Sequence, residues 1–462
     1  MSRPGEARKT LTRLGQASLF FGFAFAVMAD PVSSAAYAPE AALRALHGHL
    51  ELLFSTMALV IGLTALVTVN YWFLVKRFPQ GGGDAEAAGR AFSTAWAFPV
   101  IGALIVDFVL TIAISIAAAS SAIIAYVPSL HPVRIPLALG LLTLVAGITW
   151  FGHAGRLLFA VFTSLFIVAT VLVLVPGFLS PAHPHGVVVT TGAVDPALLA
   201  VMFAFPVAMA LATGIEAPLT SIAQLGQLDD DGKRRFGRGT LVLTVGIVSA
   251  ISLLLTALAV RLDVGVPTGV ETTWIADLAK AAVGDGATFA FFQLASSILL
   301  LSAASSSYQA GPGLLKALAR NEHGRGLGIL PLPLGLSNRH HTPYWAVVVY
   351  LAVAAVVIVA AQAKEQELVL FYAVAVFASF LMGLLAMARF TWREGNHRLF
   401  AVNCFSASCV AFTLAVNLAR GYPIASFAAV VLIAVGLYRL WVRAGRPEGV
   451  AELERMMEDP AE

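Results

Sequence analysis

The chain has 462 residues, of which 59% are hydrophobic and 12% are charged, and its mean hydropathy is +0.84. Soluble globular domains carry about 25% charged residues, so this composition excludes a soluble enzyme. The formal net charge of +3 gives no indication of a nucleic-acid partner. Hydrophobic residues recur in runs of about 20, which is long enough to cross a hydrocarbon core of about 30 Å. We therefore expect an all-α integral membrane protein.

The apolar runs predict twelve transmembrane helices. In chain order they cover 16–46, 51–75, 95–125, 135–151, 156–175, 199–222, 240–260, 288–319, 343–361, 366–390, 400–418 and 422–441. The loop 261–287 contains WIADLAKAAVGDG, which predicts a short amphipathic helix. The segments outside the spans are too short for a soluble domain, so we expect neither an enzyme nor a bound cofactor.

Basic residues are distributed unequally between the two sides of the predicted membrane. Of the 29 Lys and Arg residues, only six fall on the side opposite the termini, namely Arg44, Arg134, Arg261, Lys280, Lys364 and Arg420. Cytoplasmic loops carry the excess of Lys and Arg in membrane proteins. We therefore predict a multi-pass protein of the inner (plasma) membrane with both termini in the cytoplasm.

Three carboxylates lie inside predicted spans. Asp30, Asp107 and Glu216 are each surrounded by apolar sequence, and no Lys or Arg lies in the middle of any span. An ionisable side chain at mid-membrane costs roughly 2.5 to 3.5 kcal/mol on insertion scales. Such residues require a partner, a water-filled cavity or a substrate, so these three carboxylates predict a functional site.

Helix-breaking residues accompany two of these carboxylates. Pro31 follows Asp30 in the first span, and Thr213-Gly214 precedes Glu216 in the sixth. Interrupted helices at corresponding positions of two halves indicate an inverted-repeat transporter with its site near the midplane. We predict unwound segments at Pro31 and Gly214, near Asp30–Val32 and Thr213–Ile215, and two five-helix repeats. The predicted domains are a cytoplasmic N-terminus (1–15), a transporter core (16–390), two additional helices (400–441) and a cytoplasmic tail (442–462).

With these features the chain resembles the amino acid, polyamine and organocation (APC) superfamily of transporters with the LeuT-type fold. The segment DPVSSAAYAPEA is most similar to the first span of Kup- and KimA-type potassium importers. The resemblance implies twelve helices with a 5+5 inverted repeat, the first and sixth helices being broken. It also implies potassium uptake.

The same resemblance implies the residues of a cation site. An Asp with a Tyr seven residues later, an Asp with hydroxyls four and eight residues later, TGIEA and YAVAVF match the patterns of that group. One departure is Phe108, where the KimA pattern has a Tyr. The implied site residues are Asp30, Tyr37, Asp107, Thr111, Ser115, Thr213 and Tyr372, with Glu216 beside them.

The chemistry of these side chains agrees with a monovalent cation without reference to the resemblance. A hard cation prefers several oxygen ligands, and carboxylate, hydroxyl and phenol oxygens are present without soft donors. The spacing of Asp107, Thr111 and Ser115 places them on one face of a helix. That face can line a cavity, and no other metal site is predicted.

Two other substrate classes fit the same fold. Amino acid permeases receive the substrate carboxylate on glycine-rich backbone of the first span, whereas here that stretch has no glycine and carries Asp30. Nramp-type divalent-metal transporters share an Asp-Pro pair but place a Met donor in the sixth span. Here Met202 and Met209 both precede the break. We favour potassium, with a proton-coupled amino acid or organic amine permease as the alternative.

No Walker A motif is present, so transport must use ion gradients or the membrane potential. Concentrative uptake then requires a coupled ion, for which we expect a proton. A buried carboxylate can carry it, and Glu216 is the leading candidate with Asp30 second. Small residues in the last two helices allow a homodimer.

Overall fold

The computed structural model describes residues 13–81, 83–151, 156–179, 197–225, 228–319, 326–421 and 423–453. Within these ranges the chain is helical, and the only β-pairing is an isolated bridge between Ala319 and Leu330. Of the predicted terminal segments, most of 1–15 and the last part of 442–462 lie outside the described residues.

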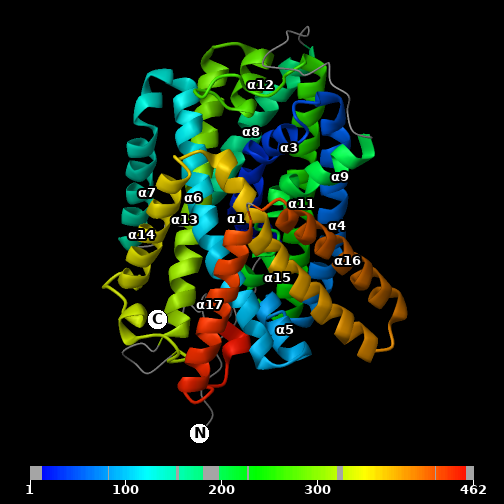
Figure 1. The fold of residues 1–462 in the computed structure, drawn as a ribbon, viewed down its shortest axis with the longest axis vertical. Coiled ribbons are helices and arrows are strands. Elements are labelled where there is room, and N and C mark those ends of the chain that lie inside the picture. The colour runs from blue at the N-terminus through cyan, green and yellow to red at the C-terminus, as the bar shows by residue number, and fades with distance from the viewer. Residues whose placement is uncertain are drawn as a thin grey trace.

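The helices pack side by side in one bundle (Figure 1). The longer helices are α1 (Arg13–Val27), α4 (Leu53–Arg77), α6 (Ala97–Tyr126), α7 (Arg134–Trp150), α8 (Arg156–Leu179), α9 (Ala197–Ala208), α11 (Asp230–Leu262), α13 (Ala287–Leu318), α14 (Tyr344–Ala360), α15 (Glu365–Arg393), α16 (His397–Ala419) and α17 (Ile424–Arg443). The short helices are α2 (Ala29–Ser33), α3 (Ala38–Ala45), α5 (Asp84–Ala91), α10 (Ala217–Thr220) and α12 (Trp274–Val283). The 3-10 turns are η1 (Ser34–Ala36), η2 (Leu50–Leu52), η3 (Thr94–Trp96), η4 (Pro128–Val133), η5 (Met209–Ala212), η6 (Ser221–Gln224), η7 (Leu332–Gly335) and η8 (Val450–Glu452).

Ten helical segments within the described residues are long and apolar enough to cross a membrane. An eleventh span is formed if α1 and the segment Ala29–Ala45, which are bent by 50° at their break, are taken together. The helix α14 is also apolar, but with 17 residues it is shorter than these ten segments. The chain is therefore a multi-pass helical membrane protein, and the count of twelve spans stays a prediction.

The helix α6 lies at the centre of the bundle. In its most apolar stretch 89% is buried inside the bundle, against 28% in the corresponding stretch of α7. The reason is that α6 packs against α13, α15 and α17. The contact with α17 brings two backbones together, since an ideal Cβ on Gly102 would stand 2.7 Å from the carbonyl oxygen of Val430. Most side chains of α6 are therefore buried by protein and do not face lipid.

The first span is broken beside the segment that the sequence predicts. Asp30 and Pro31 lie within α2, in its first turn, where a proline is tolerated because its missing N–H would have no helical partner. The helical dihedrals are interrupted on either side, at Met28 and at Tyr37, whose φ and ψ are −129° and −23°. Pro31 is therefore helical, and the break nearest to the predicted Asp30–Val32 segment lies at Met28, two residues before Asp30.

The sixth span is interrupted between η5 and α10. Thr213 is extended, with φ −56° and ψ 137°, and Gly214 has a positive φ of 72°. Such a backbone conformation favours glycine, because a Cβ would be strained there. The helix resumes only after Glu216.

Short elements close the two ends of the bundle (Figure 1). We call the end with α12 the outer end and the end with α5 the inner end, following the predicted orientation. The short amphipathic helix predicted in 261–287 is confirmed as α12, which begins with Thr273 accepting from the N–H of Ala276. At the inner end α5 packs against α15 and η8, where Val450 and Leu453 are fully buried.

Candidate functional site

The two interrupted spans touch each other at mid-bundle. An ideal Cβ on Gly214 would stand 2.9 Å from Pro31 Cδ and 3.0 Å from Asp30 Oδ2, so only a glycine fits here without displacement. The Ser34 hydroxyl lies 3.3 Å from the carbonyl oxygen of Leu211, to which it donates, and so links η1 with η5. The sequence-predicted Asp30 and Gly214 are therefore brought side by side.

The helices α6 and α15 supply the opposite wall. Asp107, Thr111 and Ser115 are buried on α6, and Tyr372 is buried on α15. The Thr111 hydroxyl donates to the Tyr372 hydroxyl at 3.2 Å, and Tyr372 also lies within hydrogen-bonding reach of the Asp107 carboxyl. The predicted face of α6 thus meets the predicted tyrosine of α15.

The remaining predicted side chains join the same group. Tyr37, at the end of η1, interacts with the side chains of Thr213 and Ser33. The carboxylate of Asp107 is close enough to act electrostatically on Asp30, Glu216 and Tyr37. These interactions link seven of the eight side chains predicted for cation binding and proton coupling, and Ser115 lies one helical turn beyond Thr111 on α6.

The carboxylates in this region have no cationic partner. No ion pair with Asp30, Asp107 or Glu216 is found among the described residues. One oxygen of each carboxylate, Asp30 Oδ1, Asp107 Oδ1 and Glu216 Oε2, is buried without a hydrogen-bond partner, as is Ser115 Oγ. Burying an unpaired carboxylate is costly unless a cation, a proton or water compensates it. A cation or a proton at this position would therefore stabilise the buried oxygens.

One residue of this region was missed by the sequence analysis. Tyr350 on α14 is 1% exposed, interacts electrostatically with Asp107, and its hydroxyl has no partner among the described residues. A tyrosine in an otherwise apolar helix was its only signal. It packs closely on α13, because a Cβ on Gly311 would stand 2.5 Å from Tyr350 Cζ.

Polar contacts close the outer end above the site. Three residues beyond Tyr37, Glu40 accepts from the backbone N–H of Trp274 at 2.9 Å and pairs with Arg44 at 2.8 Å. At the start of α15, Glu365 accepts from the Ser121 hydroxyl at 2.6 Å. Arg134 stands 3.9 Å from the same carboxylate. These contacts tie α3 to α12, and they tie α15 to α6 and α7.

A divalent-metal site is not evident in the described part of the chain. No group of three or more His, Cys, Asp or Glu side chains there is arranged to hold a metal ion. Met209 is buried at the start of η5, immediately before the break in the sixth span. The donors around the break itself are oxygens.

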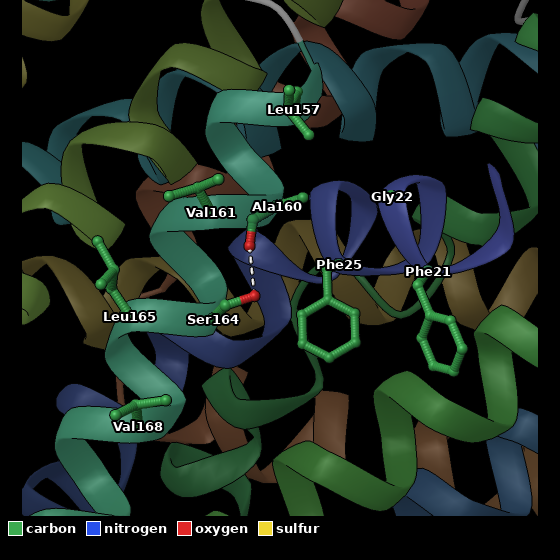
Figure 2. A pocket seen from close by; sticks show the side chains of 9 residues that line it. All are labelled: Phe21, Gly22, Phe25, Leu157, Ala160, Val161, Ser164, Leu165 and Val168. Atoms are coloured by element: carbon green, nitrogen blue, oxygen red, sulfur yellow. Dashed lines mark hydrogen bonds between the residues drawn. The ribbon is translucent and has the colours of Figure 1, made fainter. Parts of the chain in front are cut away.

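Two further cavities are not lined by Asp30, Asp107 or Glu216. A groove of about 430 Å³ separates α1 from α8 and is apolar apart from Ser164, whose hydroxyl donates to the carbonyl of Ala160 in its own helix (Figure 2). A second cavity of about 810 Å³ lies between α6, α14, α15 and α17, and Tyr350 and Val106 line it. Neither groove has a carboxylate of the site in its lining.

Sequence comparison relates the chain to a potassium transporter. No family model matches it. The chain is 26% identical over 345 residues to the potassium transporter KimA of Bacillus subtilis strain 168, an alignment that covers 72% of this chain and 54% of the relative. The chain therefore spans about half the length of the curated relative it matches.

Structure comparison shows a fold shared with a transporter. Two crystal structures of mutant forms of the Eremococcus coleocola manganese transporter align with TM-scores of 0.52 and 0.51. These alignments cover 94% and 96% of this chain and 96% of each manganese transporter chain, at 14% sequence identity. At this identity the likeness shows the fold alone.

Proposed function

We propose that this protein is a secondary-active membrane transporter of the APC superfamily that takes up potassium together with protons by alternating access. The observation that carries the proposal is the set of unpaired buried oxygens on Asp30, Asp107 and Glu216, beside the hydroxyls of Thr111 and Tyr372. The similarity to a potassium transporter supports it. The fold shared with an ion transporter is consistent with it.

The donor set favours a weakly hydrated monovalent cation. Carboxylate, hydroxyl and phenol oxygens replace a hydration shell without demanding the rigid octahedral geometry that smaller divalent ions require. Asp107, Thr111, Ser115 and Tyr372 provide one side of the site, while Asp30, Tyr37 and Thr213 provide the other. We assign cation binding to these seven residues.

Proton coupling is assigned to Glu216. It follows the break in the sixth span and interacts electrostatically with Asp107 and Asp30, without belonging to the face of α6. Three carboxylates cannot all be charged around one monovalent cation in a low-dielectric site without large repulsion. A proton on Glu216 removes one of these charges while potassium is bound.

The test is uptake of rubidium, as a surrogate of potassium, into proteoliposomes with and without an inward proton gradient. We expect accumulation that potassium competes away and that the proton gradient increases. A panel of amino acids and organic amines, and manganese, is measured beside it. Uptake of an amino acid without rubidium would replace the proposal by a permease, and uptake of manganese alone would replace it by a divalent-metal transporter.

A further inference from the structure

A fourth buried carboxylate lies at the inner end, outside the cation site. Asp84 is the first residue of α5 and is 4% exposed. Its Oδ2 accepts from the Tyr71 hydroxyl on α4 at 2.7 Å and from the Ser379 hydroxyl on α15 at 3.1 Å. One carboxyl group thus joins three elements that close the inner end.

The sequence of α15 makes room for this carboxyl. A Cβ on Gly383 would overlap Asp84 Oδ1, so any other residue at position 383 would push α5 away from α15. Asp84 Oδ1 has no hydrogen-bond partner among the described residues. A charged carboxylate is therefore poorly compensated in this arrangement, whereas a neutral carboxyl is tolerated.

Among the described residues, no ion pair with Asp84 is found, and only the hydroxyls of Tyr71 and Ser379 act on its carboxyl in favour of the charged form. Across from it, Arg90 on α5 pairs with Glu86 at 2.7 Å and with Glu452 of η8 at 3.4 Å. Arg389 of α15 stacks on the Phe92 ring at 5.2 Å. The turn η3 and the first eight residues of α6 contain no titratable side chain. Among the described residues, Tyr71 donates a hydrogen bond to Asp84, and the Asp84 charge acts electrostatically on Glu216.

Burial raises the pKa of the Asp84 carboxyl from its ordinary value of 3.8 to about 7, and the hydroxyls of Tyr71 and Ser379 oppose that rise. Because this pKa is raised in the packed arrangement, packing takes up a proton. The equilibrium between released and packed α5 therefore shifts toward release by up to about tenfold per pH unit between about 4 and about 7, and it levels off above that.

The helix α15 connects Asp84 with the cation site. Ser379 follows Tyr372 by seven residues, which is about two helical turns on the same face, or about 10 Å. A shift of α15 relative to α5 therefore acts at both places. The side chains of Tyr372 and Ser379 are both buried, so neither hydroxyl is exposed to the membrane.

We propose that Asp84 is a proton-operated latch of the inner end, which holds α5 against α4 and α15 when neutral and releases α5 when ionised. The ligand of this site is a proton, and the site is separate from the cation site. Under the proposed function, cytoplasmic acidification caused by proton-coupled uptake closes the inner end and limits further uptake. The latch itself does not depend on the identity of the transported substrate.

The test measures how readily α5 is exposed, without any substrate. Ala87, which is fully buried on α5, is replaced by cysteine in a background with Cys404→Ser and Cys409→Ser. The rate of labelling by a maleimide is measured from pH 5.5 to 8 in the purified protein. Each rate is divided by that of the same protein with Asp84→Asn, which cancels the pH dependence of the reagent.

We expect this ratio to rise severalfold or more between pH 5.5 and about 7 and then to level off. The Tyr71→Phe variant removes a hydrogen bond that favours the charged carboxylate, so its ratio continues to rise above pH 7. The Asp231→Asn variant removes an acid whose side chain is 77% exposed and keeps the parent profile. A flat ratio over this range, or a plateau that Tyr71→Phe leaves in place, overturns the latch.

A second comparison decides the matter if Asp84→Asn does not fold. The labelling rate of Tyr71→Phe is divided by that of the parent, which cancels the reagent chemistry in the same way. We expect this quotient to be flat up to about pH 7 and to increase above it. A quotient that is flat throughout contradicts the latch. Failure of rubidium uptake bears on the proposed function and leaves this labelling result unchanged.

Discussion

The backbone of Gly214 lies directly against the carboxylate of Asp30, so closely that a Cβ on the glycine would stand 3.0 Å from Asp30 Oδ2. This contact joins the two interrupted spans at the point where three carboxylates gather. It also makes the geometry of the site sensitive to a single methyl group, from which a first prediction follows.

Gly214→Ala should reduce rubidium uptake by at least about tenfold. The alanine must adopt a positive φ, which costs about 1–2 kcal/mol, and its methyl group displaces Asp30 or Pro31. Uptake into proteoliposomes measures the effect. The matched control is Gly246→Ala on α11, where nothing lies within 4 Å of the added methyl group. Equal uptake by the two variants would show that the contact with Asp30 does not matter for transport.

Asp107→Asn should abolish rubidium uptake while the protein still folds. Asp107 provides the only formal charge on the face of α6 that carries Thr111 and Ser115, and one of its oxygens has no partner among the described residues. Asn keeps the shape and removes the charge. Asp285→Asn, in a side chain that is 76% exposed, serves as the control and should transport normally. Normal accumulation by Asp107→Asn would make this residue structural.

Thr111→Val should weaken cation binding by roughly ten- to a hundredfold. The substitution removes an oxygen ligand of the cation and also the 3.2 Å hydrogen bond that Thr111 donates to Tyr372, and a typical hydrogen bond contributes about 0.5–1.5 kcal/mol. The expected signature is a raised KM for rubidium with a smaller change in maximal rate. Thr143→Val is the control, because that hydroxyl bonds only to the Leu139 carbonyl of its own helix. An unchanged KM in Thr111→Val would remove Thr111 from the ligand set.

Glu216→Gln should separate cation binding from proton coupling. The amide imitates a permanently protonated acid, so binding of rubidium survives while the dependence of uptake on the proton gradient is lost. If Glu216 only supports the broken backbone, Gln makes similar hydrogen bonds and pH-driven uptake persists. Binding and pH-jump uptake are measured on the same variant. Retained pH-driven accumulation contradicts the carrier role, and lost binding assigns Glu216 to the cation site.

The residues of the candidate site could be predicted because polar side chains in apolar runs are conspicuous. Asp30, Asp107 and Glu216 stand out against their surroundings, and the spacing of Thr111 and Ser115 fixes their helix face. The exact place of the break in the first span could not be predicted. Proline perturbs a helix differently in its first turn than in its interior, and nothing in the local sequence indicates that α2 starts at Ala29.

Asp84 illustrates what a sequence conceals. It lies among Gly and charged residues between two spans, a pattern typical of a solvated loop. Its burial depends on Tyr71 and on Ser379 and Gly383, which are about 300 residues away along the chain. Nothing in local composition reports such a long-range contact. Tyr350 was missed for the same reason.

The contact between Gly102 and Val430 has a consequence for anyone who wishes to shorten this protein. The two helices after position 400 were predicted as an addition to a ten-helix core, yet α17 touches the backbone of α6, the helix that carries Asp107. A chain cut after α15 exposes the side of α6 around Gly102 to lipid. The helix α17 therefore supports the most buried helix of the bundle, and a shortened protein requires redesign of the face of α6 around Gly102.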